Sequence, residues 1–287
     1  MDLSRKNFLK VLGATGMLFA QGSKTNATPT ESDKTEFNAI LYDSTRCGGC
    51  QTCEYSCAEA NGLPDPTDEI KAGVIRNTDE NHRTVVNAFA LNSGEQYLKK
   101  QCMHCNEPAC ASACLTKAMY KTKEGPVIWR EDKCMGCRYC MVSCPFDIPK
   151  FEYNSANPKI VKCSMCYDRQ TAGQKPACVE NCPAEALVFG TRRELLKEAR
   201  KRISEAPDQY YDHIYGEREA GGTGFLYLSA VPFTELGLKD IQNSSYPSLT
   251  KGFLYSVPAV FVLWPTILLG LREATKDNPV KNDDNEK

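Results

Sequence analysis

Histidine and tryptophan are scarce in this 287-residue chain, with three and two copies, and neither sign of charge is in excess. The 35 Lys and Arg residues against 36 Asp and Glu give a net charge of −1, which does not favour nucleic acid as a partner. Hydrophobic residues make up 41% of the chain and the mean hydropathy is −0.44. This composition excludes a polytopic membrane protein, a collagen-like chain and a wholly disordered one. The length suits one or two domains.

The sequence also lacks the motifs that indicate a substrate site. It contains no phosphate-binding loop, no dinucleotide-binding fingerprint and no nucleophile constellation. What it has in excess is cysteine, with 16 residues against three histidines. We therefore expect a chain without catalytic residues, whose function depends on what its cysteines bind.

The cysteines form four groups of four, and none is left over. Groups one and three share the spacing C-x2-C-x2-C-x3-C, while group two widens one gap to four residues and group four widens the same gap to eleven. A pattern that tolerates insertions in one fixed gap is typical of an internal repeat. The groups are Cys47, Cys50, Cys53 and Cys57; Cys102, Cys105, Cys110 and Cys114; Cys134, Cys137, Cys140 and Cys144; and Cys163, Cys166, Cys178 and Cys182.

This spacing is that of the cluster ligands in two-cluster bacterial ferredoxins. Three closely spaced thiolates in a tight loop can converge on one cubane. The fourth, which we expect at the start of the following short helix, ligates the other cluster of a pair. Pro145 and Pro183 follow the fourth cysteines of groups three and four, whereas Ala58 and Leu115 stand there in groups one and two. All sixteen cysteines are thus predicted to be cofactor-binding metal ligands for four 4Fe-4S clusters.

Three other uses of the cysteines fit the spacing less well. An even count permits disulfides, but cysteines this crowded make a framework that pairs poorly. Zinc ribbons use two well-separated C-x2-C pairs, and haem attachment needs a histidine directly after such a pair, which never occurs here. A zinc-binding structural or interaction protein remains the alternative from another functional class.

Residues 1–27 are predicted to be an export signal that resembles the twin-arginine type. Arg5 and its basic neighbours precede an apolar run from Val11 to Ala20, which is too short to span a bilayer. Lys6 stands where such a signal would carry its second arginine. An export route for folded cargo suits a protein loaded with clusters. The alternatives are an uncleaved anchor or an amphipathic cytosolic start.

A second apolar run, from Phe253 to Leu271, has nineteen residues without a charge and is long enough to cross a bilayer. Its two prolines are tolerated better in a membrane helix than in a soluble one. We predict a transmembrane helix over residues 251–272, preceded by a cluster domain over 28–250 and followed by a charged cytoplasmic tail over 273–287. Positive residues after the run favour a periplasmic main domain. A buried soluble helix is the alternative.

Several local patterns predict structure between the two ends. Residues 84–91 and 95–98 flank Asn92-Ser93-Gly94, which indicates a hairpin. Short strands are expected at 127–129 and 225–229. The stretch Thr191-Arg192-Arg193-Glu194 is a capping box that begins a helix to about Ile203.

Basic residues are frequent in the cysteine loops. They could stabilise anionic clusters and raise their potentials, dock an acidic partner, or simply be solvated. His104 lies between two cysteines and is expected to support a sulfur rather than to ligate iron. The basic residues in question are Lys133, Arg138, Lys150, Lys159, Lys162 and Arg169.

Beyond the cysteines, several stretches resemble one family, the four-cluster ferredoxin-like subunits of membrane-bound oxidoreductases. The resemblance is nearest to the iron–sulfur subunit of the periplasmic-facing uptake NiFe hydrogenase, and the chain is also similar to formate dehydrogenase beta subunits. It runs from the signal to the final helix. The stretches are residues 41–45, 99–105, 136–142, 189–192 and 215–223.

The resemblance implies which cysteines share a cluster. Groups one and four exchange their fourth cysteines, and so do groups two and three. The implied ligand sets are Cys47, Cys50, Cys53 with Cys182; Cys163, Cys166, Cys178 with Cys57; Cys102, Cys105, Cys110 with Cys144; and Cys134, Cys137, Cys140 with Cys114.

The resemblance also implies the fold and the function. The fold class would be α+β, with two pseudo-symmetric two-cluster ferredoxin-like modules and one C-terminal transmembrane helix. The subunit would be non-catalytic and would relay electrons between a catalytic subunit, with hydrogenase small and large subunits favoured, and a quinone-reactive membrane subunit. The alternatives of the same class are a formate dehydrogenase beta subunit and a subunit of a multihaem cytochrome–quinone complex.

Overall fold

The computed structural model describes residues 36–92 and 94–275. It divides the chain into two units, one formed by residues 32–249 and the other containing most of the last helix. The first unit holds all sixteen cysteines. The predicted signal at residues 1–27 and the part of the predicted tail from residue 276 onward lie outside the described residues.

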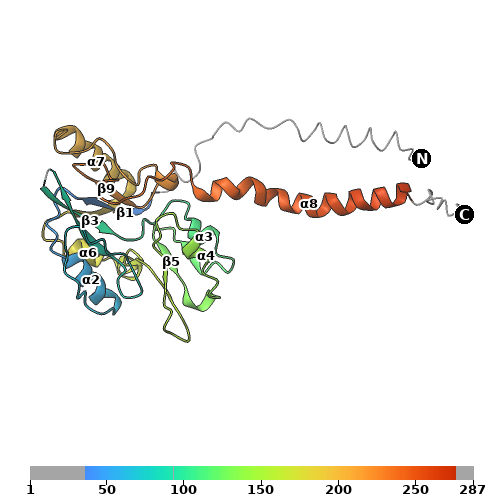
Figure 1. The fold of residues 1–287 in the computed structure, drawn as a ribbon, viewed down its shortest axis with the longest axis horizontal. Helices are drawn as coiled ribbons and strands as arrows, with labels where there is room; N and C mark the ends of the chain where they lie inside the picture. Colours follow the sequence, from blue (N-terminus) through green and yellow to red (C-terminus); the bar gives the residue numbers. More distant parts are fainter. Residues whose placement is uncertain (1–35, 93, 276–287) are drawn as a thin grey trace, which may run out of the picture. The chain divides into compact units, whose positions relative to one another are not determined.

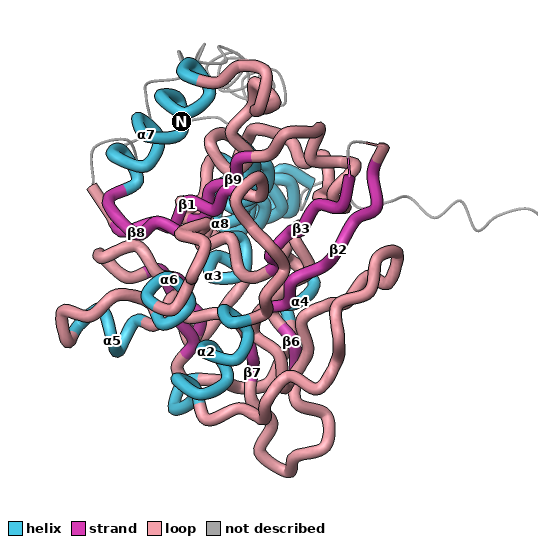
Figure 2. The backbone as a smooth tube through the Cα atoms, turned by 90° about the vertical axis from the view of Figure 1, so that its left-hand side faces the viewer, coloured by secondary structure: helices cyan, strands magenta, loops and turns pink. Residues whose placement is uncertain are grey.

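The first unit is organised around a three-stranded sheet in the order β8-β1-β9 (Figure 2). Strand β1 (Asn38–Asp43) pairs antiparallel with β8 (Leu187–Thr191) and parallel with β9 (Phe225–Leu228). The strand predicted near residues 225–229 is confirmed. β1 is the central strand, and its middle residues are apolar without interruption because a core covers each of its two faces.

The two faces of this sheet border two different cores. Ile40 and Tyr42 of β1 belong to a large core against which many of the cysteines pack. Ala39 and Leu41 belong to a second core with residues of helix α7 (Arg192–Glu205). The division follows from the period of two along a strand. Figure 1 shows α7 beside β1 and β9 on that second side.

Helix α7 confirms the predicted capping box. Thr191 accepts a hydrogen bond from the Glu194 backbone N–H, and the Glu194 carboxylate accepts one from the Thr191 N–H. The buried residues Leu195 and Ala199 lie one turn apart and face the sheet. The helix ends at Glu205, close to the predicted end at Ile203.

The predicted hairpin is present as β2 (Val85–Leu91) and β3 (Gly94–Lys100). Helix α2 (Thr52–Asn61) holds it through Glu54, whose side chain is 1% exposed. The Glu54 carboxylate accepts the Val86 N–H at 2.7 Å and forms a two-point ion pair with Arg76, at 2.5 and 3.1 Å. One buried carboxylate therefore ties the hairpin to the helix that carries two cysteines.

Short elements make up the rest of the first unit. One ladder pairs β4 (Met119–Lys121) with β5 (Val127–Trp129), which confirms the strand predicted at 127–129. Another pairs β6 (Lys150–Phe151) with β7 (Ile160–Val161). Among the described residues, 3-10 turns occur at η2 (Glu131–Lys133) and η3 (Glu219–Gly221).

Each cysteine group contains one short helix whose second residue is the third cysteine of the group. These helices are α2, α3 (Ala109–Ser112), α4 (Tyr139–Val142) and α6 (Ala177–Glu180), and α5 (Tyr167–Thr171) lies within group four. The expectation that the fourth cysteine begins the helix is wrong. Because C-x3-C separates two cysteines by about one helical turn, the fourth lies inside α2 or just beyond the other three helices.

Helix α8 (Tyr246–Thr275) has 30 residues and contains the apolar run and both of its prolines, Pro258 and Pro265. Among the described residues it is the one helix long and apolar enough to cross a membrane. None of its most apolar stretch is buried within the chain, and Phe261 is 75% exposed.

The ion pair between Glu54 and Arg76 generates a stability prediction. Glu54→Ala leaves a buried guanidinium and the Val86 N–H without their partner, so we expect a loss of about 3–5 kcal/mol in the free energy of unfolding. For a protein of this size each kcal/mol lowers Tm by roughly 2–4 °C. The measurement is the thermal midpoint of the anaerobic, cluster-loaded protein.

The matched control is Glu59→Ala, because Glu59 is an exposed residue of the same helix. We expect it to change stability by less than about 0.5 kcal/mol. Equal midpoints for the two variants would contradict the anchoring role of Glu54.

Candidate metal centres

The four cysteine loops share one backbone feature. The residue directly before the second cysteine of each group adopts a left-handed conformation, although only two of the four are glycine. A left-handed residue is costly for a side chain, but it turns the chain sharply enough for two thiols three residues apart to face one centre. The residues are Gly49 (φ 68°), His104 (φ 49°), Gly136 (φ 70°) and Met165 (φ 54°).

Two cavities are each lined by four cysteines, drawn in both cases from groups one and four. We call these sets quartet A and quartet B. The first cavity also borders Tyr42 and Val86, and the second borders Ile40 and Phe225, so both open into the large core beneath β1. Quartet A is Cys47, Cys50, Cys53 and Cys182, and quartet B is Cys57, Cys163, Cys166 and Cys178.

Two further quartets, C and D, are brought together from groups two and three. The thiol of Cys105 lies beside those of the other three members of quartet C, and the thiol of Cys140 beside the other three of quartet D. Quartet C is Cys102, Cys105, Cys110 and Cys144, and quartet D is Cys114, Cys134, Cys137 and Cys140. The folded chain brings together the same four sets of cysteines that the resemblance implies as ligand sets, and their ligation of clusters stays a prediction.

The quartets adjoin one another in the order A, B, C, D. Cys53 of A interacts electrostatically with Cys178 of B. Cys163 of B likewise interacts with Cys102 of C, and Cys110 of C with Cys140 of D. Cys50 in A and Cys137 in D are exposed, while B and C have no exposed member. The arrangement is a single file with a solvent-accessible thiol at each end.

Burial controls the chemistry of most of these thiols. It raises the pKa of Cys53 and of Cys163 to about 12, and that of Cys140 to about 11, with neighbouring thiols adding to the effect. Cys114 differs, because the Met119 N–H, 3.3 Å from Sγ, and the Thr116 hydroxyl outweigh burial and lower its pKa. Most quartet members thus hold their protons in the folded chain until a metal replaces them.

Three lysines extend into this region. Burial alone would lower the pKa of Lys99, but the nearby thiols of quartets A and B outweigh it and raise the pKa. Burial lowers the pKa of Lys121 to about 8, and its Nζ donates to the Cys105 carbonyl at 2.9 Å. Lys162 Nζ lies 3.8 Å from Cys102 Sγ and donates to the Cys163 carbonyl at 2.8 Å.

His104 is fully buried and lies between two cysteines of quartet C. Its Nδ1 accepts the Val127 N–H at 2.9 Å, which places the ring proton on Nε2. Burial, with the charges of Lys162 and Lys121, lowers its pKa well below the usual value, so the ring is neutral. Nε2 is buried without a hydrogen-bond partner in the described part of the chain and remains a donor for a group bound beside it.

These residues fit a 4Fe-4S cluster in each quartet. Each quartet supplies four thiols and no other ligand, as such clusters require, and buried cations together with an unpaired N–H surround the inner two. Among the residues that the structure describes, no three His, Cys, Asp or Glu side chains converge closely enough to hold a single metal ion. The thiols of quartets A and B instead line cavities, as ligands of a multi-atom group do.

The remaining basic residues of the cysteine loops are surface features. Arg138 lies over the rings of Phe151 and Tyr153, at 4.2 and 4.9 Å, and Lys150 pairs with Asp147 at 3.0 Å. Lys133 and Lys159 are exposed, and Arg169 pairs with Glu180. Sequence reasoning grouped Lys162 with these residues and missed Lys99 and Lys121. The only signal for Lys99 was its place just before the first cysteine of group two.

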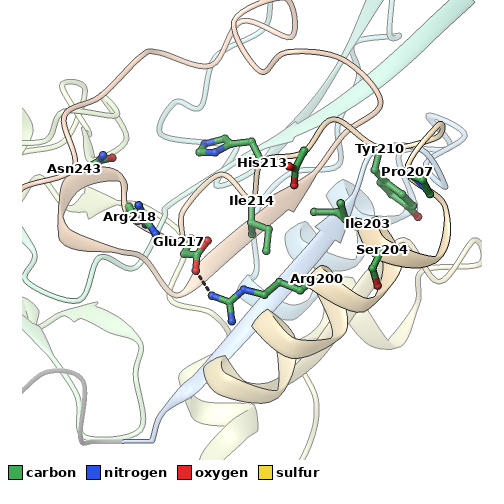
Figure 3. Close-up of a pocket in the computed structure, with 11 residues that line it drawn as sticks. Arg200, Ile203, Ser204, Pro207, Tyr210, His213, Ile214, Glu217, Arg218 and Asn243 are labelled. Carbon is green, nitrogen blue, oxygen red and sulfur yellow. Dashed lines mark hydrogen bonds and ion pairs between the residues drawn. The ribbon is translucent and has the colours of Figure 1, made fainter.

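Away from the quartets, a groove of ≈ 670 Å³ lies between the end of α7 and the loop after it (Figure 3). Arg200 and Glu217 form an ion pair across it, and Tyr210 and His213 border it. His213 Nε2 is 2.6 Å from Glu219 Oε1. The described residues that line this groove include no cysteine.

Comparison with known proteins gives relatives along almost the whole chain. A model described as a 4Fe-4S dicluster domain matches residues 94–192, which contain groups two, three and four. The chain is 42% identical to a protein of Nitratidesulfovibrio vulgaris, over 96% of this chain and 77% of that protein. It is 34% identical to the Hydrogenase-2 operon protein HybA of Escherichia coli O157:H7, over 98% and 97%. It is 32% identical to the iron-sulfur subunit of the nitrate-inducible formate dehydrogenase of Escherichia coli K12, over 83% and 85%.

The raised thiol pKa values predict how a bound cluster responds to pH. Because Cys53 and Cys163 keep their protons up to about pH 12 in the folded chain, protons compete with iron for these sulfurs, and they compete more strongly as the pH falls. We expect the loaded protein to release iron to a chelator several-fold faster at about pH 6 than at about pH 8.5. The measurement is the anaerobic decay of the visible cluster absorbance.

As a control, the chelator's own affinity for iron is measured at each pH, and the release rate is corrected for its change with pH. A corrected release rate that is flat, or that increases with pH, would show that proton competition at these thiols does not limit cluster retention.

Proposed function

As this chain belongs to the family of 4Fe-4S electron-transfer subunits of hydrogenase and formate dehydrogenase complexes, we propose that it carries four clusters in single file between a catalytic subunit and a quinone-reactive membrane subunit. The observation that carries this proposal is the assembly of sixteen cysteines into four adjoining quartets. Each quartet holds one cluster through its four thiolates. The clusters supply reversible one-electron chemistry, and the chain's own residues position them and exclude water.

The exchange of fourth cysteines between groups supports two modules within the file. Cys182 of group four completes quartet A, and Cys57 of group one completes quartet B. Cys144 and Cys114 are exchanged in the same way between groups three and two to complete C and D. We assign A with B to one ferredoxin-like module and C with D to the other, with the two inner clusters at the junction.

The subunit has no reaction of its own in this proposal. Every cysteine has a place in a quartet, so no iron is left open for a substrate. Electrons enter at one exposed end, beside Cys50 or Cys137, and leave at the other.

We assign residues 251–272, within α8, to a membrane anchor. Its apolar exposed side chains, flanked by Lys251 and Arg272, suit a bilayer. The charged tail over 273–287 is then cytoplasmic, and the domain over 28–250 lies on the periplasmic side, delivered by the twin-arginine-like signal at residues 1–27. This location brings the clusters to the surface where a quinone-reactive subunit would meet them.

Hydrogen is the electron donor we favour, and formate is the second candidate. Both are supported by relatives, since one is named for a hydrogenase-2 operon and another for a formate dehydrogenase. A multihaem cytochrome partner is a third possibility within the same class. A zinc-binding structural protein is the alternative of a different class, and metal analysis separates it from the others.

Cysteine substitutions test both the clusters and the quartets. The intact protein should contain about four irons and four sulfides per quartet, and no zinc. Cys57→Ser and Cys163→Ser should abolish the same EPR signal, because both thiols belong to quartet B. Cys47→Ser should abolish a different one, because it belongs to quartet A.

If each sequence group held its own cluster, Cys57→Ser and Cys47→Ser would instead remove the same signal. That result would overturn the exchange of cysteines between groups while leaving the cluster count intact. Zinc without sulfide in the intact protein would overturn the proposed function.

The donor is tested in native membranes under anaerobic conditions, with a deletion strain as the baseline. We expect hydrogen to reduce the clusters rapidly, as seen in the reduced-cluster EPR signals, and formate in a separate sample not to do so. Reduction by formate alone would assign the chain to a formate dehydrogenase. Reduction by neither would indicate a cytochrome or another catalytic partner.

A further inference from the structure

Two lysines occupy the interior of the quartet region, where cations are rare. Lys99 is 1% exposed and Lys162 is 5% exposed. Burying a lysine costs several kcal/mol unless a partner of opposite charge compensates it. In the part of the chain that the structure describes, neither lysine forms a salt bridge with a carboxylate. An anionic cluster in the neighbouring quartets would supply that compensating charge.

Lys162 lies where quartet B meets quartet C. Its Nζ is 3.8 Å from the Sγ of Cys102, a member of C, and it donates to the backbone carbonyl of Cys163, a member of B, at 2.8 Å. A further hydrogen bond to the Val127 carbonyl fixes its position. Its charge also reaches the thiols of Cys110 and Cys144, both in C.

Lys99 lies where quartet A meets quartet B. It lines the cavity of quartet B, and its charge interacts with Cys53 of A as well as with Cys57 and Cys178 of B. Hydrogen bonds to the Thr84 hydroxyl and, at 3.0 Å, to Gln101 Oε1 hold the ammonium in place. Two fixed cations therefore stand at two successive junctions of the file.

Quartet D differs, because no lysine of the described residues is among the main influences on the Cys140 thiol. Those influences are the other three thiols of D; Cys110 of C interacts with Cys140 as well, and the nearby Lys133 and Arg138 are exposed to solvent. A charge in water is screened, whereas one in the protein interior acts through a low dielectric constant. The electrostatic environment of the file is thus uneven, with positive charge concentrated around B and C.

We propose that Lys99 and Lys162 raise the reduction potentials of the two inner clusters and so make the middle of the file the easiest place for an electron to reside. The inference rests on the proposed function, because it requires a cluster in each quartet. A cluster ligated by four thiolates is anionic and gains one more negative charge on reduction. A fixed positive charge beside it stabilises the reduced form more than the oxidised form, and the potential increases.

The test is an anaerobic redox titration of the cluster-loaded protein, followed by EPR. Lys162→Met keeps the length of the side chain and removes its charge, and Lys162→Arg keeps the charge. The matched control is Lys159→Met, an exposed lysine three residues earlier on the same segment. Each signal is assigned to a quartet with cysteine substitutions.

We call the cluster held by each quartet by that quartet's letter. We expect Lys162→Met to make reduction of cluster C at least tenfold less favourable, which corresponds to a fall of about 59 mV in its midpoint potential. Cluster B should shift less and cluster D least. Lys162→Arg should restore most of the potential, and Lys159→Met should leave all four unchanged. Lys99→Met should shift cluster B most, and cluster A less.

A purely structural role would move none of these potentials while the clusters stay bound, and that outcome would overturn the inference without affecting the four-cluster proposal. If Lys162→Met cannot hold its clusters, a second measurement decides. In the intact protein with isotope-labelled lysine, electron–nuclear double resonance should detect side-chain nitrogen coupled to the reduced cluster of quartet C, and this coupling should decrease in Lys162→Arg, where Lys99 and Lys121 remain labelled near the quartets. No coupling in the intact protein would equally overturn the inference.

Discussion

The convergence of sixteen thiols into four quartets, with all but Cys50 and Cys137 at least partly buried, is the constraint on which the rest of the structure depends. An interior of this size would ordinarily be filled by aliphatic side chains. Here the large core of Ile40, Tyr42 and Phe225 surrounds the cysteines rather than replacing them. Burial also raises the pKa of thiols such as Cys53 and Cys163, so a cluster that binds there has to displace protons.

Short loops and helices position the cysteines in this arrangement. Each cysteine loop turns at a left-handed residue, and one helix in each group has the group's third cysteine as its second residue. Strand β1 is central because it pairs with β8 on one edge and β9 on the other. One of its faces covers the quartets and the other packs against α7. The hairpin is held against α2 by Glu54 and Arg76, which fixes the strand that carries Lys99 relative to the helix that carries Cys53 and Cys57.

The positive charge of basic side chains is distributed unevenly along the file of quartets. The basic residues of the loops are of two kinds. Some pack against other surface residues, as Arg138 does over Phe151, and others extend into the interior, as Lys162 does. Only the second kind acts on a cluster without strong screening. The neutral, N–H-bearing ring of His104 adds a dipole beside quartet C at no cost in net charge. The inner part of the file is therefore electrostatically distinct from its ends.

The sequence alone determined the cysteine spacing and its cluster chemistry, the hairpin, the capped helix from Thr191 and the apolar run from Phe253, because each depends on residues close together in the chain. It misplaced the fourth cysteine relative to the helix by about one turn, because spacing does not show where a short helix starts. Which cysteines share a centre came from a resemblance, and only the folded chain brings Cys57 to Cys163. Lys159 and Lys162 look alike in sequence. Tertiary structure alone decided that Lys162 is buried against a thiol while Lys159 is in water, because burial depends on contacts between segments that are distant in the chain.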